Sequence, residues 1–273
     1  WWGLINERKK FKKEEIDNEN LLDNLETNLR KSVSQQSHAD VDLAVFMSGG
    51  IDSSLVATLL SQTSQKKVNS FTISFPDDNN NFNEGPIASE IAKILNTNHT
   101  DVPMTEKDVQ KIIPNISSIY SEPFADSSQV PTHLISLSAS KNGIKVALTG
   151  DGGDELFAGY NRHLMIPLII KYGGIFPFRL RKKVASILLK LPFSYYSLSR
   201  NKIEKFSNAL LSKSDIASVY ESLVTKNDSL LNDHLLNKKN NKFDKSHIIS
   251  SLFEDISNFG DLEKILIADT ISY

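Results

Sequence analysis

Cysteine is absent from this chain of 273 residues, and so is any long apolar run. Without a thiol the chain can form no disulfide, no cysteine-ligated zinc site and no cysteine nucleophile. The longest apolar run, at residues 164–170, is far too short to span a bilayer. The opening residues lack the apolar stretch of a signal peptide, so we expect a cytoplasmic location and no membrane partner.

The chain also lacks a surplus of either charge. Its 31 lysine and arginine residues stand against 33 aspartate and glutamate residues, which gives a formal net charge of −2 at pH 7. A general nucleic-acid binder has a strongly basic balance, so no nucleic-acid partner is expected. Apolar residues make up 40% of the chain and charged residues 23%, which is typical of a folded globular protein.

Strand and helix patterns alternate over residues 14–148. Apolar residues recur at helical spacing within 14–34, which predicts an amphipathic helix. Strands are expected at 43–47, 68–75, 99–102 and 144–148. Helices are expected between them, after residue 51, at 86–95, after Thr105 with a kink at Pro114, and at 130–140. This alternation predicts an α/β fold with a mainly parallel sheet and helices on both faces.

Beyond residue 160 the sequence becomes helical and irregular. A basic amphipathic stretch at 179–191 is interpreted as a helix packed on the core, with a membrane-surface helix as the less favoured alternative. A segment rich in lysine and asparagine at 238–245 is expected to be an exposed loop. Helical periodicity returns at 248–267.

A glycine turn follows the first strand at residues 48–54, which read S-G-G-I-D-S-S. A buried strand, a tight turn and a helix N-terminus leave backbone N–H groups unpaired at the positive end of the helix dipole, where phosphate binds. No lysine lies between Val41 and Gln65, so this is not a Walker P-loop. The alternative is an ordinary turn that Asp52 or Ser53 caps.

An acidic turn follows the fourth strand at residues 149–155, which read T-G-D-G-G-D-E. Two carboxylates held about 4 Å apart repel each other by roughly 1 to 4 kcal/mol. A magnesium ion removes that repulsion, and it prefers carboxylate and phosphate oxygens as ligands. The alternative is a solvated acidic turn with no ligand.

Together these two turns resemble the synthetase domain of glutamine-dependent asparagine synthetases. The similarity runs from residue 43 through L-T-G-D-G-G-D-E-L-F-A-G-Y, which ends at Tyr160, and includes F-T-I-S-F at 71–75. The resemblance implies a PP-loop ATPase core of the adenine-nucleotide alpha-hydrolase type. It places a linker and helix at 1–36, the ATP-binding core at 37–165 and a helical extension of the same domain at 166–273.

In that family ATP adenylates the side-chain carboxylate of aspartate, pyrophosphate leaves, and ammonia then displaces AMP to form asparagine. The resemblance therefore implies ATP and Mg²⁺ as cofactors, with aspartate and ammonia as substrates. Asp52 and Asp154 would hold the magnesium ion. The residues expected to contact ATP come from both turns and from two strand ends, and they are Met47, Ser48, Gly49, Gly50, Asp52, Ser53, Ser54, Ile73, Thr149 and Gly150.

Asp151 is the expected catalytic residue, because it stands where well-studied members carry a glutamate tied to forming the acyl-adenylate. Its side chain is one methylene shorter. Residues 122–128, E-P-F-A-D-S-S, either face the acceptor substrate or form a loop capped by Asp126 or Ser127. His99 is expected near the ligand edge of the sheet, in an ordinary structural role.

Two parts of the family's machinery are missing from this sequence. The glutaminase half is absent and is expected as a partner domain in the full-length protein. The chain also stops after 269–273, just before a stretch that carries a catalytic lysine in the family, so the fragment alone is expected to be impaired. A homodimer remains open.

Three other functions compete with an asparagine-forming ligase. A related amidotransferase or cyclase could act on another carboxylate, as the β-lactam-forming members do. An RNA-modifying enzyme can use the same ATP loop, but it needs a basic face that this composition does not supply. The chain could also be an inactive nucleotide-binding module.

Overall fold

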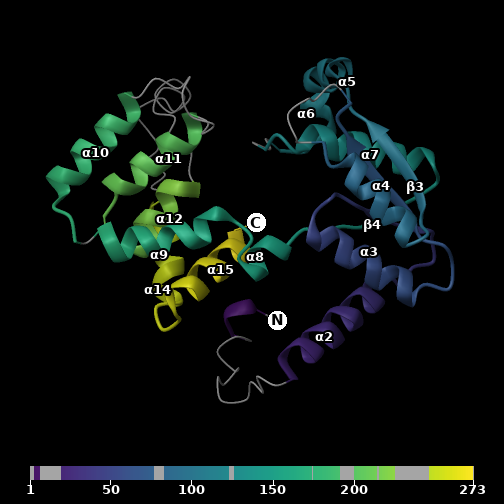
Figure 1. The fold of residues 1–273 in the computed structure, drawn as a ribbon, viewed down its shortest axis with the longest axis horizontal. Coiled ribbons are helices and arrows are strands. Elements are labelled where there is room, and N and C mark those ends of the chain that lie inside the picture. Colours follow the sequence, from purple (N-terminus) through teal and green to yellow (C-terminus); the bar gives the residue numbers. More distant parts are fainter. Residues whose placement is uncertain are drawn as a thin grey trace. The chain divides into compact units, whose positions relative to one another are not determined.

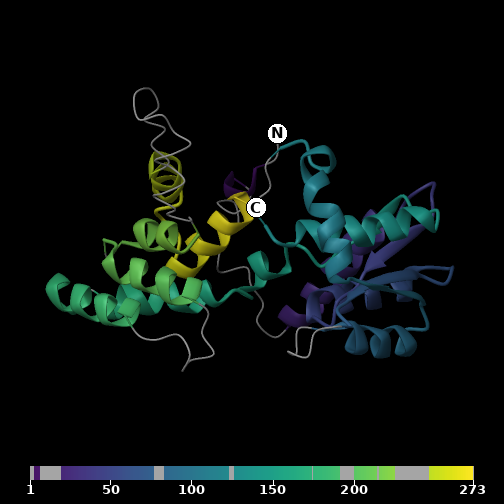
Figure 2. The same ribbon diagram turned by 90° about the horizontal axis from the view of Figure 1, so that it is seen from above.

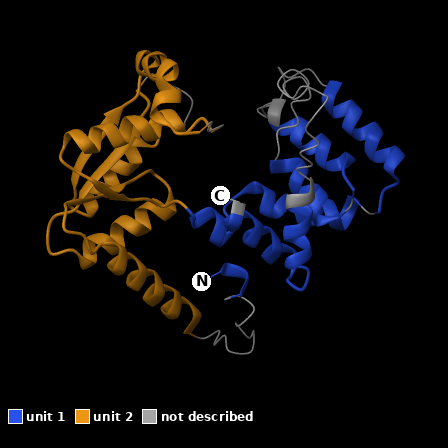
Figure 3. Ribbon diagram, turned by 180° about the vertical axis from the view of Figure 1, so that it is seen from behind, with its two compact units in different colours: residues 1–12, 152–273 blue, residues 13–151 orange. Residues whose placement is uncertain are grey.

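The computed structural model describes residues 3–6, 20–76, 83–122, 126–173, 175–190, 200–213, 215–224 and 246–272. Within it the chain divides into two compact units, Lys13–Asp151 and the pair of segments Trp1–Lys12 and Gly152–Tyr273 (Figure 3). The loop expected at 238–245 lies outside the described residues, as does most of the loop after 76. The boundaries expected at 36/37 and 165/166 stay predictions.

The unit Lys13–Asp151 alternates helices and strands as the sequence predicts (Figure 1). Its elements in chain order are α2 (Leu21–Gln36), β1 (Leu43–Phe46), α3 (Ile51–Thr63), β2 (Asn69–Ser74), α4 (Gly85–Ile94), β3 (Asn98–Pro103), α5 (Glu106–Ile112), η3 (Ile113–Asn115), α6 (Ile116–Ile119), α7 (Gln129–Lys141) and β4 (Val146–Leu148).

Four parallel strands form the sheet of this unit, in the order β3-β2-β1-β4. Side chains of β1 alternate between two apolar clusters, because successive residues of a strand point to opposite faces. Val45 packs with α2, α3 and α4, whereas Ala44 packs with Phe71 and α7. Helices therefore cover both faces (Figure 2), and the expected α/β fold class is confirmed.

The helix expected after Thr105 shows how local sequence sets the ends of an element. Thr105 and Asp108 form a reciprocal capping box at the start of α5, which satisfies two N–H groups of the helix N-terminus. The α-helix stops at Ile112, and Pro114 lies in the short 3₁₀ turn that follows. Proline removes a helical hydrogen bond and clashes with the preceding turn. The sequence predicted that Pro114 would kink the helix, whereas in the structure the α-helix is interrupted there.

The second unit is helical in its described residues. Its elements are α8 (Gly153–Phe157), α9 (Asn161–Gly173), α10 (Phe178–Lys190), α11 (Arg200–Leu211), α12 (Ile216–Val224), α14 (Ser246–Asp255) and α15 (Asp261–Ser272). Its core is one apolar cluster that draws on α9, α11, α12, α14 and α15, and Leu4 and Ile5 from the start of the chain pack against it.

Helix α10 is the basic amphipathic stretch expected near 179–191. It packs against α11, and Ala185 of α10 is buried. Arg181 Nη1 donates hydrogen bonds of 3.3 Å to the carbonyls of Leu210 and Ser212. Helix α10 thus packs against a neighbouring helix, but it adds no residue to the apolar core, and Leu180, Val184 and Ile187 stay exposed. The choice between a packed helix and a membrane-surface helix stays a prediction. Across the ranges that the structure describes, every helix is too short or too polar to cross a membrane.

His99 does not lie at the ligand edge, and that expectation was wrong. His99 is the second residue of β3 and pairs with Ser70 of β2. The start of a parallel strand lies at the edge of the sheet opposite the carboxyl ends, where ligands bind. His99 Nδ1 lies 3.0 Å from Ser70 Oγ. Burial lowers the pKa of His99 below its ordinary value of 6.5, and the negative charge of Asp101 opposes that shift in part.

This lowered pKa predicts a loss of stability in mild acid. The unfolded chain takes up a proton at His99 more readily than the folded chain does. The contribution of His99 to the unfolding free energy is therefore complete above pH 6.5 and falls as the pH drops below that value. Urea unfolding at several pH values checks this. His99→Asn should flatten the decline while His38→Asn, at an exposed residue, should not. Equal slopes for the wild type and His99→Asn would refute it.

Candidate functional site

The glycine turn and the start of the acidic turn lie at one point of the sheet edge. The chain moves from β1 to β2 and β3 on one side, whereas β4 lies on the other side of β1. The strand order therefore reverses between β1 and β4. In open parallel sheets, ligands bind at such a reversal, beyond the carboxyl ends of the strands. Ser48 follows β1 and Thr149 follows β4 at that edge.

Hydrogen bonds between its own residues brace the glycine turn. The amide of Ser48 donates to Ser53 Oγ at 3.0 Å, and the two serine hydroxyls lie 2.9 Å apart. The amide of Gly50 donates to Ser48 Oγ at 3.1 Å, and Ser54 Oγ donates to the carbonyl of Gly50 at 2.6 Å. Because Ser53 is buried and its hydroxyl is engaged, the group that it offers a ligand is its amide.

The N-terminus of α3 has no side-chain cap. Gly50 occupies the cap position and has no side chain that could accept a hydrogen bond from the first turn of the helix. Neither Asp52 nor Ser53 caps the helix, although Ser53 Oγ accepts a hydrogen bond from the Ser48 amide within the turn. The first amides of a helix have no hydrogen-bond partner within the helix, and they form the positive end of its dipole. In α3 these are the amides of Ile51, Asp52 and Ser53. That arrangement suits a phosphate group.

The turn after β4 touches the start of α3 through Gly150. A Cβ atom at Gly150 would lie 2.6 Å from the Ser53 amide nitrogen and 3.1 Å from the Asp52 carbonyl carbon. Only a glycine allows the two backbones to approach so closely. Beside it, Thr149 Oγ1 donates to Asp151 Oδ2 at 2.9 Å, which fixes the direction of that exposed carboxylate. The structure thus brings residues from both turns together.

Met47 and Ile73 differ in what their backbone groups can offer a nucleotide. The Met47 amide donates to the Phe71 carbonyl at 2.8 Å, and its carbonyl accepts from Thr72 Oγ1 at 2.6 Å. The backbone of Ile73 faces the same side as that of Phe71, because the direction alternates along a strand. Since β1 ends at Phe46, Ile73 faces the space past that end, and it is the better candidate to contact adenosine.

Glu84 is a residue at this edge that the sequence-based assignment of site residues missed. Its Oε2 accepts a hydrogen bond of 3.1 Å from the Gly49 amide. Asn83 Oδ1 accepts from the amides of Phe75 and Gly85, which ties the start of α4 to the end of β2. Glu84 therefore satisfies one amide of the glycine turn and leaves those of α3 for a ligand. The sequence signal for it is an acidic residue directly before the helix expected at 86–95. The family resemblance also includes that acidic start.

Residues 122–128 show a local role in the part that is described. Asp126 Oδ1 accepts a hydrogen bond of 2.7 Å from the Ser128 amide, and this bond holds the pKa of Asp126 below its ordinary value. Residues 123–125 lie outside the described residues. A capped loop accounts for Asp126, and contact with the acceptor substrate stays a prediction.

Asp154 belongs to the second unit, in the first turn of α8. Its carboxylate packs directly against the Gly159 backbone, where a Cβ atom would have no room. Among the described residues, no three histidine, aspartate or glutamate side chains gather as a metal site. Magnesium bound through one or two carboxylates and phosphate oxygens does not need such a group. Asp52 and Asp154 are both half-buried and fit that chemistry by donor type.

Comparison with known proteins agrees with the resemblance. The family model for asparagine synthase matches residues 24–266. A putative asparagine synthetase [glutamine-hydrolyzing] 2 of Methanocaldococcus jannaschii is 35% identical over 149 residues, which cover 54% of this chain and 28% of that protein. Asparagine synthetase [glutamine-hydrolyzing] 1 of Bacillus subtilis is 25% identical over 260 residues, which cover 95% of this chain and 39% of that protein.

This chain therefore spans well under half the length of these two curated relatives. Among solved structures, an NH3-dependent NAD synthetase from Campylobacter jejuni aligns with 86% of this chain and 93% of its own, at 14% identity and a TM-score of 0.35. That likeness is too remote to assign a function. The family model, in contrast, covers most of the chain, and the chain belongs to the asparagine synthase family.

Proposed function

We propose that this protein is an ATP-dependent ligase that adenylates the side-chain carboxylate of aspartate and lets ammonia displace AMP, which gives asparagine. The uncapped N-terminus of α3 carries the proposal, because it offers an anion site at the reversal point of the sheet, against the turn after β4. Membership of the asparagine synthase family supplies the reaction class.

The glycine turn binds the pyrophosphate part of ATP through amides instead of a lysine. The amides of Ile51, Asp52 and Ser53 receive the phosphate oxygens, and Ser54 lies one residue further along the helix. Glu84 and the Ser48–Ser53 pair hold the turn in shape before ATP arrives, so little reorganisation is needed at the moment of binding. Ile73 contacts the adenosine through its backbone, whereas Met47 lines the site as the residue that follows β1.

The acidic residues divide the remaining roles. Asp52 and Asp154 would hold a magnesium ion, which would supply positive charge beside the phosphate oxygens of the leaving pyrophosphate. Asp151, whose direction Thr149 fixes, acts at the carboxylate that is being adenylated. Thr149 and Gly150 close over the nucleotide. Ammonia comes from a glutaminase domain, which the relatives' description as glutamine-hydrolysing suggests.

Aspartate-dependent exchange between ATP and labelled pyrophosphate tests the proposal in the complete protein. We expect exchange with aspartate and Mg²⁺, and none with glutamate or without an acid. Exchange with a different acid alone would refute aspartate as the substrate and favour a related amidotransferase or cyclase. Nucleotide binding without exchange for any acid would refute the ligase and leave a nucleotide-binding module.

A further inference from the structure

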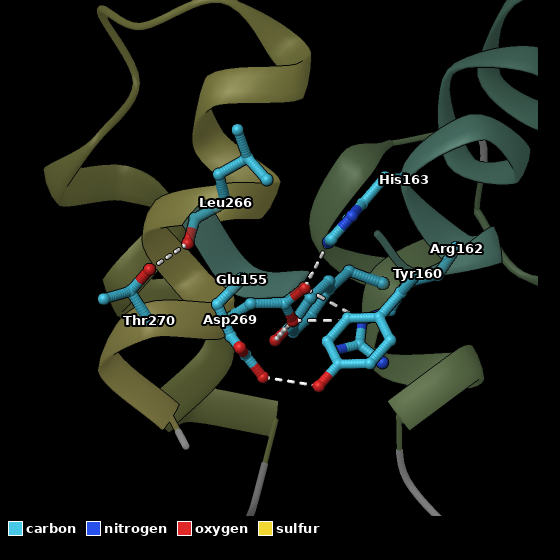
Figure 4. A network of polar contacts seen from close by, with 8 residues as sticks. Glu155, Tyr160, Arg162, His163, Leu266, Asp269 and Thr270 are labelled. Atoms are coloured by element: carbon cyan, nitrogen blue, oxygen red, sulfur yellow. Dashed lines mark hydrogen bonds and ion pairs between the residues drawn. The ribbon is translucent and has the colours of Figure 1, made fainter. Parts of the chain in front are cut away.

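A buried carboxylate joins three helices of the unit that contains Asp154 (Figure 4). Asp269 of α15 is 2% exposed. Arg162 Nε donates to both of its oxygens, at 3.1 and 2.9 Å, and His163 Nε2 lies 2.6 Å from Oδ2. Tyr220 of α12 donates its hydroxyl to Oδ1 at 2.7 Å. Removing a partner from a buried carboxylate is costly, so Asp269 holds Arg162, whose side chain is itself 28% exposed.

Arg162 links this carboxylate to a second buried one through Tyr160. The Arg162 guanidinium stacks on the Tyr160 ring, 3.8 Å from its centre. The Tyr160 hydroxyl donates to Glu155 Oε1 at 2.5 Å, and Glu155 is 2% exposed. Burial and the bond to Glu155 raise the pKa of Tyr160, so its hydroxyl keeps its proton and remains a donor. The contacts therefore run from Asp269 to Glu155 without a gap.

Glu155 is the neighbour of Asp154 in α8, a helix too short to be stable without contacts to the rest of the unit. Helix α8 has only five residues, far fewer than an isolated helix needs in water. Gly152 and Ala158, at its two ends, have positive φ angles of 88° and 61°, so the flanking backbone does not continue it. Helix α8 packs on α15. Fixing the Glu155 side chain sets the rotation of α8, and thereby where the Asp154 carboxylate points.

We propose that Tyr160 is a positioning residue for Asp154, and that Asp269 fixes Tyr160 through Arg162. This inference rests on the proposed function, because only there is Asp154 a metal ligand. Loss of the Tyr160 hydroxyl should loosen Glu155, let α8 turn, and weaken metal binding without touching the glycine turn.

Two matched tyrosine substitutions test this inference in the complete protein. Tyr160→Phe and Tyr220→Phe each remove one hydroxyl that donates to a buried carboxylate, but only Tyr160 lies between Asp269 and Asp154. Mn²⁺ binding, measured by EPR with a non-hydrolysable ATP analogue bound, reports on the site without turnover. We expect about 10-fold weaker Mn²⁺ binding for Tyr160→Phe and a change within about twofold for Tyr220→Phe. The midpoint temperature of thermal unfolding should fall by similar amounts in the two variants.

Equal effects of the two substitutions on Mn²⁺ affinity, or none from Tyr160→Phe, would overturn the inference and leave a purely structural network. The variant Asp154→Asn distinguishes failure of the positioning role from failure of the proposed function. If Asp154→Asn weakens Mn²⁺ binding and Tyr160→Phe does not, only the positioning role fails. If Asp154→Asn changes nothing, the metal assignment itself fails. Should Tyr160→Phe not fold, Arg162→Lys replaces it, because lysine keeps the charge beside Asp269 but loses the flat stacking surface.

Discussion

Gly150→Ala is expected to weaken ATP binding on the order of 100-fold, because it pushes apart the two turns that form the site. The added methyl group would lie 2.6 Å from the Ser53 amide nitrogen and 3.0 Å from its Cα atom. Both are backbone atoms of α3 and cannot rotate away as a flexible side chain can. The start of the helix or the turn after β4 must shift, at a cost of about 1–3 kcal/mol in unfolding free energy. Calorimetric titration with a non-hydrolysable ATP analogue and thermal unfolding measure the two effects.

Gly143→Ala is the matched control for that substitution. Gly143 follows α7 in the same unit with a φ angle of 79°, and nothing lies within 4 Å of a Cβ atom built on it. Alanine there should cost about 1 kcal/mol in backbone strain and leave nucleotide affinity unchanged. Gly150→Ala protein that binds the analogue as tightly as the wild type would show that contact between the turns is not needed for the site.

Asp151→Asn should retain ATP binding but slow pyrophosphate exchange on the order of 100-fold. Even a small misplacement of a catalytic group slows a reaction by that much. Asparagine keeps the size of the side chain and can still accept the hydrogen bond from Thr149, but it removes the negative charge. Analogue titration and exchange rates, measured side by side, separate binding from chemistry.

Asp42→Asn provides the comparison for Asp151→Asn. Asp42 precedes β1 at the opposite end of the sheet and makes only an exposed ion pair of 3.5 Å with Lys66. Surface pairs of that kind contribute little, so exchange should persist in this variant. Pyrophosphate exchange at the wild-type rate in Asp151→Asn would refute the catalytic role of Asp151.

The secondary structure and the edge that holds the site could be predicted because their signals are local. Hydrophobic spacing predicted the four strands and the helices α4 and α7 to within a few residues, whereas α2 begins at Leu21 and not near residue 14. The parallel order then placed the turns after β1 and β4 at one edge. His99 was placed wrongly because a residue at the start of a parallel strand lies opposite the edge where ligands bind.

Contacts between distant parts of the chain could not be predicted. Arg162 and Asp269 are 107 residues apart, and Gly49 and Glu84 are 35 apart. The sequence around each of these residues does not indicate its partner, because the pairing depends on how distant segments of the chain pack. The structural role of the Ser53 hydroxyl could not be predicted either. The spacing of a motif shows which residues lie at the ligand-binding edge, but not which of their atoms are already hydrogen-bonded within the protein.

The most direct test is a crystal structure of the complete protein with Mg²⁺ and a non-hydrolysable ATP analogue. The proposed function predicts the β- and γ-phosphates on the amides of Ile51, Asp52 and Ser53, with one magnesium ion held by Asp52 and Asp154. Phosphates bound elsewhere, or a metal ion that neither aspartate contacts, would contradict it.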